Sequence, residues 1–242
     1  MRIARLNYVS VLLAVLFMPT VSQAEVSAEV AVVSDYRDNG VSNSDRKPAL
    51  QVELAYEHDS GLYASGWASN VDYGKDEDGE SYPERVELEL ALGYGFDVNA
   101  DLSLDFGVAS YSYIGKTDSS DSNYQELYVG ANFFGNTEFY TYYAPDYFIS
   151  DVRNFIFSLS HAIELNDYVL GLKAVHYQSG NKERLAWREN KADYQDFEVS
   201  IARDLRGFTV GLAAIVTTIT DGEEKDAAKP TAVLSISKAW SW

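Results

Sequence analysis

Cysteine is absent from the 242 residues, and this absence excludes disulfides, thiolate metal sites and cysteine nucleophiles. Basic residues are scarce, because 19 Lys and Arg stand against 37 Asp and Glu and leave a net charge of −18. Without a basic stripe to neutralise phosphates, the chain is not expected to bind nucleic acid. Beyond residue 24, no apolar run approaches the ~20 residues of a membrane-spanning helix.

Proline is also rare, and its positions are informative. There are five prolines, and Pro48, Pro83, Pro145 and Pro230 all lie in or beside polar connecting segments. None of these four interrupts an alternating segment, where it would remove a hydrogen bond from a β-ladder. Tyr (18), Phe (11) and Gly (16) are by contrast abundant. Aromatic residues and glycines are favoured in β-barrels, at the membrane interfaces and at points of curvature.

The first 24 residues have the pattern of a secretory signal peptide. Arg2 and Arg5 precede an apolar run over 9–18, and small residues follow up to Ala24. A membrane anchor is the alternative, but the apolar run is shorter than the ~20 residues that a spanning helix needs. We therefore predict a signal peptide over 1–24 and one exported domain over 25–242.

Apolar residues alternate most clearly with charged and small residues over 84–96. Side chains alternate between the two faces of a β-strand, so the parity of each residue predicts its face. The segment reaches the ~9–11 residues of a tilted strand that crosses a bilayer. One parity is apolar, and the other carries charges and then small residues: Val86, Leu88, Leu90, Leu92, Tyr94 and Phe96 against Arg85, Glu87, Glu89, Ala91, Gly93 and Gly95.

Similar segments recur along the chain and predict twelve strands. Tight turns and long polar connections alternate between them, as in outer-membrane barrels with short periplasmic turns and longer extracellular loops. The predicted fold is therefore all-β, a transmembrane antiparallel β-barrel of about twelve strands with both ends in the periplasm. The predicted strands are 26–37, 49–58, 62–73, 85–96, 102–113, 124–133, 137–144, 153–165, 168–178, 194–203, 208–218 and 231–242.

Periodicity alone also allows a soluble barrel or sandwich with its apolar face inside. The length of the strands favours a barrel whose apolar outer face contacts lipid. Aromatic residues near strand ends also favour it, and we interpret them as membrane-interface residues: Tyr63, Trp67, Tyr73 and Tyr168. The last residues of the sequence include Trp240 and Trp242, and a terminal aromatic strand resembles the signal recognised by the barrel-assembly machinery. The expected location is the outer membrane of a Gram-negative bacterium, with its lipids as partners.

The segment 34–51, SDYRDNGVSNSDRKPALQ, resembles the opening motif of the TorF family of proteobacterial porins. DSGLY at 59–63 and WASNV at 67–71 fit the same pattern, which is dense over 26–73 and looser to the C-terminus. The sequence departs from the pattern at Asn39, where an Arg is expected before the glycine, so a shared ion preference does not follow. The resemblance implies an outer-membrane barrel with pore activity and supplies no substrate.

The residues predicted to line the pore are mostly acidic. Rings of carboxylates in a narrow aqueous path favour cations. We therefore predict passive diffusion of small solutes with a cation preference, and an acidic lumen disfavours acidic oligosaccharides. The alternative is a plugged barrel with a structural or adhesive role through its outer loops. The pore-lining candidates are Glu29, Asp35, Arg37, Glu53, Glu57, Arg85, Glu87, Glu89, Asp105, Glu126, Lys173 and Glu198.

An outer-membrane lipid hydrolase is a third hypothesis. A catalytic serine and its histidine must share a hydrogen bond. Ser158 and Ser160 differ in parity from His161, so they are expected on the opposite face, and we predict that the chain is not an enzyme. No cofactor or metal is predicted. Acidic clusters at 76–80, 118–121 and 221–226 lack the spacing of a calcium loop and are interpreted as solvated loops.

Overall fold

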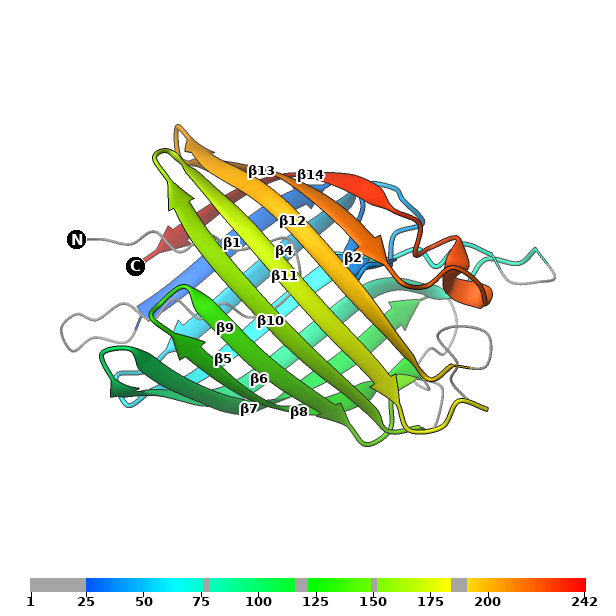
Figure 1. Ribbon diagram of the computed structural model, residues 1–242, viewed down its shortest axis with the longest axis horizontal. Coiled ribbons are helices and arrows are strands. Elements are labelled where there is room, and N and C mark those ends of the chain that lie inside the picture. Colours follow the sequence, from blue (N-terminus) through cyan, green and yellow to red (C-terminus); the bar gives the residue numbers. More distant parts are fainter. Residues whose placement is uncertain (1–24, 76–78, 116–121, 149–151, 184–190) are drawn as a thin grey trace.

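The computed structural model describes residues 25–75, 79–115, 122–148, 152–183 and 191–242, so the predicted signal peptide lies outside the described residues. Twelve strands form one closed antiparallel barrel in which β1 pairs with both β4 and β14 (Figure 1). This confirms the predicted fold class. The strands are β1 (Glu25–Val33), β4 (Ala49–Glu57), β5 (Leu62–Asn70), β6 (Glu84–Asn99), β7 (Leu102–Gly115), β8 (Tyr124–Phe133), β9 (Thr137–Ala144), β10 (Asn154–Leu165), β11 (Tyr168–Ser179), β12 (Asp193–Leu205), β13 (Phe208–Thr217) and β14 (Thr231–Ser241).

Short and long connections lie at opposite ends of the barrel. The tight hairpin turns share one end with the start of β1 and the end of β14, and the long connections gather at the other end (Figure 1). One long connection contains a short 3-10 helix, η3 (Glu223–Lys225). Within the described residues, no helix is long and apolar enough to cross a membrane.

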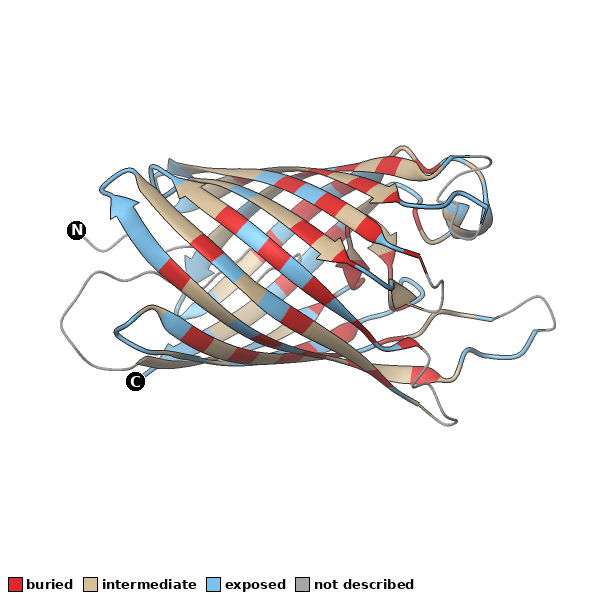
Figure 2. Ribbon diagram, turned by 90° about the horizontal axis from the view of Figure 1, so that it is seen from below, coloured by how far each residue is buried: buried red, intermediate tan, exposed pale blue. Residues whose placement is uncertain are grey.

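The two faces of the wall differ as the alternation predicts. Leu92 is 62% exposed on the outside, whereas its neighbour Ala91 is 3% exposed on the inside. Figure 2 shows the same exchange of buried and exposed residues along strand after strand. Exposed Leu, Val, Ile and Phe side chains cover the outer surface, including Leu50, Leu127 and Val129. An apolar outer band of this kind is suited to contact with lipid.

The first strand is shorter than predicted. The expected strand over 26–37 ends at Val33, so Asp35 and Arg37 do not belong to the barrel wall. The chain instead turns into the barrel and forms a small hairpin of β2 (Arg37–Asp38) and β3 (Val41–Ser42). Local bonds replace the ladder there, because the Ser44 hydroxyl accepts a hydrogen bond from the Tyr36 backbone N–H at 2.9 Å.

The interpretation of Tyr63, Trp67 and Tyr73 as membrane-interface residues is wrong. Tyr63 and Trp67 are each 5% exposed and face the barrel interior. Tyr73 packs inside against the Tyr113 ring at a centroid distance of 6.4 Å. Only Tyr168, which is 40% exposed, lies on the outer surface as expected. Proximity to a strand end was therefore a weaker guide than parity, since 63 and 67 share the inward parity of β5.

Small residues on the inward face make room for tyrosines. A Cβ on Gly93 would lie 2.3 Å from the Tyr63 hydroxyl, and a Cβ on Gly107 would lie 2.3 Å from the Tyr128 hydroxyl. The two rings cross the paired glycines of β6 and β7, and their hydroxyls are 2.5 Å apart. The change from charges to glycines along 84–96 thus provides the space that these tyrosines occupy.

Gly107→Ala is expected to destabilise the barrel. Its Cβ would also lie 2.5 Å from the Leu92 carbonyl oxygen, which cannot move without disturbing the ladder. Overpacking of this kind costs ~1–3 kcal/mol. The midpoint of thermal unfolding, measured by circular dichroism in detergent, should fall. Gly66→Ala is the matched control, because its Cβ would meet only the Cδ2 at the end of the flexible Leu90 side chain, at 3.3 Å. Equal midpoints for the two variants would contradict this account.

Candidate functional site

The segment 34–48, here called the inward hairpin, is anchored by a buried arginine. The side chain of Arg37 is 1% exposed, and its Nε donates to Asp35 Oδ2 at 2.7 Å. Its Nη1 donates to the Gly40 carbonyl at 2.7 Å and to the Lys229 carbonyl at 3.1 Å. One guanidinium therefore joins the base of the hairpin, its tip and the connection between β13 and β14.

The inward hairpin reaches two separate walls of the barrel. The Tyr36 hydroxyl donates to Glu87 on β6 at 3.0 Å, and the Tyr194 hydroxyl of β12 donates to the Asn39 carbonyl at 3.1 Å. Asn39 has a φ of 45°, a left-handed conformation that asparagine adopts more readily than most residues. The hairpin thus spans the interior and divides it into two parts.

Apolar packing fills one of these parts. Tyr36 meets Trp67 edge-to-face at a centroid distance of 5.5 Å. Buried residues from both ends of the chain surround this contact and leave a solid core. They are Val33, Ala49, Val71, Ala213, Ile215 and Val233.

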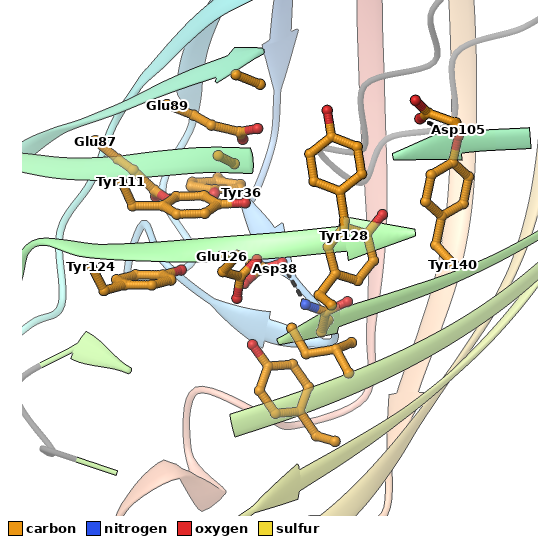
Figure 3. Close-up of a pocket in the computed structure, with 16 residues that line it drawn as sticks. Tyr36, Asp38, Glu87, Glu89, Asp105, Tyr111, Tyr124, Glu126, Tyr128 and Tyr140 are labelled. Atoms are coloured by element: carbon orange, nitrogen blue, oxygen red, sulfur yellow. Dashed lines mark hydrogen bonds between the residues drawn. The ribbon is translucent and has the colours of Figure 1, made fainter. Parts of the chain in front are cut away.

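An open cavity, whose volume of about 690 Å³ includes space that is open to solvent, occupies the other part (Figure 3). Seven tyrosines and five carboxylates line it, and no Lys or Arg is among the described residues of its lining. Most of the lining comes from β6 to β11, and the inward hairpin supplies the rest. The lining residues are Tyr36, Asp38, Asn39, Glu87, Glu89, Ala91, Asp105, Ala109, Tyr111, Tyr124, Glu126, Tyr128, Tyr140, Tyr142, Ile156 and Tyr177.

Tyrosine hydroxyls hold two of the carboxylates in place. Asp105 accepts hydrogen bonds from Tyr63 at 2.8 Å and from Tyr140 at 3.1 Å. Glu87 accepts a bond from Tyr113 at 3.3 Å in addition to the one from Tyr36. Hydrogen bonds to a carboxylate partly replace the water that burial removes. These carboxylates therefore have fixed positions in the wall of the cavity.

The structure brings four of the twelve predicted pore-lining residues together in this cavity: Glu87, Glu89, Asp105 and Glu126. Glu198 is buried on the inward face of β12, outside the lining. Arg85 donates to the carbonyls of Tyr82 and Glu84 at a wall bulge. Asp35 and Arg37 pair within the inward hairpin. Four more are partly buried on the inward parity of their strands: Glu29, Glu53, Glu57 and Lys173.

Three acidic residues of the interior are not among the pore-lining residues predicted from the sequence. Asp196 is 1% exposed and shares the inward parity of Glu198, so parity was sufficient to find it. Glu84 is 6% exposed, although its parity predicts the outer face, because a bulge between Glu84 and Val86 shifts the register. Asp38 lines the cavity from the hairpin, and no strand pattern predicts the path of a loop.

The serine and histidine positions follow parity. Ser158 is 4% exposed on the inside, whereas His161 faces outward, with its Nδ1 at 2.8 Å from the Thr137 hydroxyl. Among the described residues, no group of three His, Cys, Asp or Glu is placed to hold a metal ion. The acidic residues at 76–78, 118 and 121 lie outside the described residues. Trp240 and Trp242 are 44% and 69% exposed at the end of the chain.

A model of the bacterial family of unknown function Gcw_chp matches residues 19–240. The chain belongs to this family. No curated protein sequence matches it. Among solved structures, the KdgM porin is similar over 90% of this chain and 99% of its own, at 10% identity and a TM-score of 0.53. The NanC porin is similar over 88% and 98%, at 9% identity and the same TM-score. The Gcw_chp chain therefore has a porin-like fold.

Arg37→Ala should release the inward hairpin. Removing one partner of a buried ion pair costs ~3–5 kcal/mol, because it leaves Asp35 charged and unpaired. We expect trypsin to cut the folded variant after Arg46 much faster than it cuts the parent protein, as measured by mass spectrometry of timed digests.

Lys47→Ala is the matched control. Lys47 pairs with Asp72 at 2.8 Å and with Asp45 at 2.9 Å, but these groups are exposed, and such pairs contribute only ~0–1 kcal/mol. Trypsin should cut this variant after Arg46 no faster than it cuts the parent protein. Equal rates of cleavage after Arg46 in the Arg37 and Lys47 variants would show that the buried pair does not hold the hairpin.

Proposed function

We propose that this Gcw_chp protein is an outer-membrane channel for passive diffusion of small solutes, with a preference for cations. The supporting observation is the charge of its interior. Among the described residues, the buried acids outnumber the buried bases by eight to one. The acids are Asp35, Glu84, Glu87, Glu89, Asp105, Glu126, Asp196 and Glu198, and the base is Arg37.

An acidic path favours cations for a simple electrostatic reason. Low-dielectric walls focus the field of the carboxylates into the aqueous space, which raises the local concentration of cations and lowers that of anions. One structure of the KdgM porin is a complex with oligogalacturonate, which is an anionic sugar chain. The interior of the Gcw_chp chain is acidic and is expected to attract cations rather than anions, so the shared fold does not support a shared substrate.

The outer-membrane location rests on two features. The barrel carries an apolar outer surface, and the chain is expected to begin with an export signal. The resemblance of 26–73 to the TorF family implies the same location and pore activity. The lipids of that membrane and the barrel-assembly machinery, through Trp240 and Trp242, are the proposed partners.

A closed barrel that acts through its outer loops is the second candidate. The inward hairpin and the apolar core around Trp67 favour it, because they block part of the interior. Planar-bilayer recording of residues 25–242 under a salt gradient separates the two functions. Discrete current steps with a cation-selective reversal potential support the channel, and a folded but silent barrel supports the closed form.

Replacing Glu87 and Glu89 together by Gln should weaken the cation preference. Each lost charge removes an attraction of ~1 kcal/mol at close range in water, and ~1 kcal/mol is about fivefold in a population. Because two charges are lost, we expect the cation-to-anion permeability ratio from the reversal potential to fall at least about fivefold, which is the effect of one charge. Asp101→Asn, in the exposed turn between β6 and β7, is the control and should leave the ratio unchanged. An unchanged ratio in the double variant would contradict the proposed selectivity.

Asp38 should make this selectivity depend on pH. Burial raises the pKa of the Asp38 carboxyl to about 6, while the Lys173 charge opposes the rise. A raised acid pKa means that the negative charge is present above pH ~6 and is lost below it. The permeability ratio should therefore fall between about pH 7.5 and about pH 5. Asp38→Asn should have a lower ratio at about pH 7.5 and a shallower pH profile, and coincident profiles would exclude Asp38 as the cause.

A further inference from the structure

Glu89 differs from the other carboxylates of the cavity. It is 6% exposed, and within the described residues it has no hydrogen-bond donor and no cationic partner. The charged groups that act on it most strongly are acidic and include Glu87 and Glu126. Figure 3 shows Glu89 at the cavity on the same side as Glu87 and Tyr111. The structure thus contains a buried acceptor that points into open space without a donor.

Such a carboxylate is suited to a ligand that brings both charge and donors. Burying a charged acceptor without hydrogen bonds is costly, and a positively charged donor removes most of that cost. Anions are disfavoured at this position by five carboxylates in the lining. A cation without N–H or O–H groups would supply charge but would leave the oxygens of Glu89 without hydrogen bonds.

Aromatic rings surround the space beside Glu89. Tyr111 and Tyr124 are stacked at a centroid distance of 4.5 Å, and both line the cavity with Tyr128 and Tyr142. Tyrosine faces attract cations and also cover hydrocarbon chains. A bare or hydrated metal ion would make no use of the apolar area of these rings, whereas an organic cation would.

We propose that this cavity binds protonated aliphatic amines, with an ammonium group on Glu89 and the carbon chain against Tyr111 and Tyr124. An ammonium group carries three donors, which the oxygens of Glu89 and Glu126 can accept. A second ammonium group on a longer amine would meet the carboxylates elsewhere in the lining, such as Asp105. The inference that such amines are substrates of the channel rests on the proposed function. The inference that the cavity binds them rests on the geometry of the cavity alone.

The test is equilibrium binding, which does not require conduction. Isothermal titration of folded, detergent-solubilised residues 25–242 uses three probes that share a four-carbon chain. 1,4-Diaminobutane carries positive charges and hydrogen-bond donors. Its fully methylated bis-quaternary analogue carries the charges without the donors, and 1,4-butanediol carries donors without any charge. We expect saturable binding of the diamine, at least about tenfold weaker binding of the bis-quaternary analogue, and no detectable binding of the diol.

Glu89→Gln should weaken binding of the diamine at least about tenfold, which corresponds to ~1.4 kcal/mol. Glu164→Gln is the matched control, because it removes the same charge from an exposed position at the turn end of β10 and should leave the affinity unchanged. A gel assay of heat modifiability verifies that both variants are folded. Equal affinity for the diamine and its bis-quaternary analogue, or equal loss in both variants, would overturn the proposal.

This result and the conduction experiment have separate outcomes. A protein that binds the diamine but passes no current keeps the amine site and excludes the channel. A protein that conducts cations but binds no diamine keeps the channel and excludes the site.

Discussion

Closure of the sheet is the constraint on which the rest of the structure depends. A strand in lipid has no water to hydrogen-bond its backbone, so a sheet that faces lipid must have no edge. The pairing of β1 with β14, from Ser27 opposite Ser241 to Val33 opposite Ser235, removes the last edge. Once the sheet is closed, alternation places every second side chain inside, and the barrel needs some means of filling or hydrating a narrow interior.

This protein fills its interior unevenly. The inward hairpin enters from the end with the long connections and is held at its base by the Arg37–Asp35 pair. On one side of it, Tyr36 and Trp67 join a solid apolar core. On the other side, the glycines of β6 and β7 let Tyr63 and Tyr128 lie across the wall, and a cavity remains. The hairpin therefore both narrows the barrel and shapes the space beside it.

The chemistry of the cavity follows from combining tyrosines with carboxylates. Tyrosine hydroxyls donate to Glu87 and Asp105, and in the described part of the chain these buried acids have no basic partner. The same rings present faces that attract cations. In the fold shared with the KdgM and NanC porins, the number of strands sets the size of the lumen and the inward side chains set its charge.

The sequence by itself determined the fold class, the number of strands, the alternation of short and long connections and the faces of residues such as Glu87, Leu92 and Ser158. These features follow from local periodicity, which survives in any window of the chain. Only the tertiary structure decided the path of the inward hairpin, the inward turn of Glu84 and the gathering of four of the predicted acids around one cavity. Those features depend on register, on a bulge and on contacts between residues far apart in sequence, such as Tyr36 with Glu87 and Tyr194 with Asn39. Parity assigns a face to each residue, but it contains no information about which residues meet across the interior.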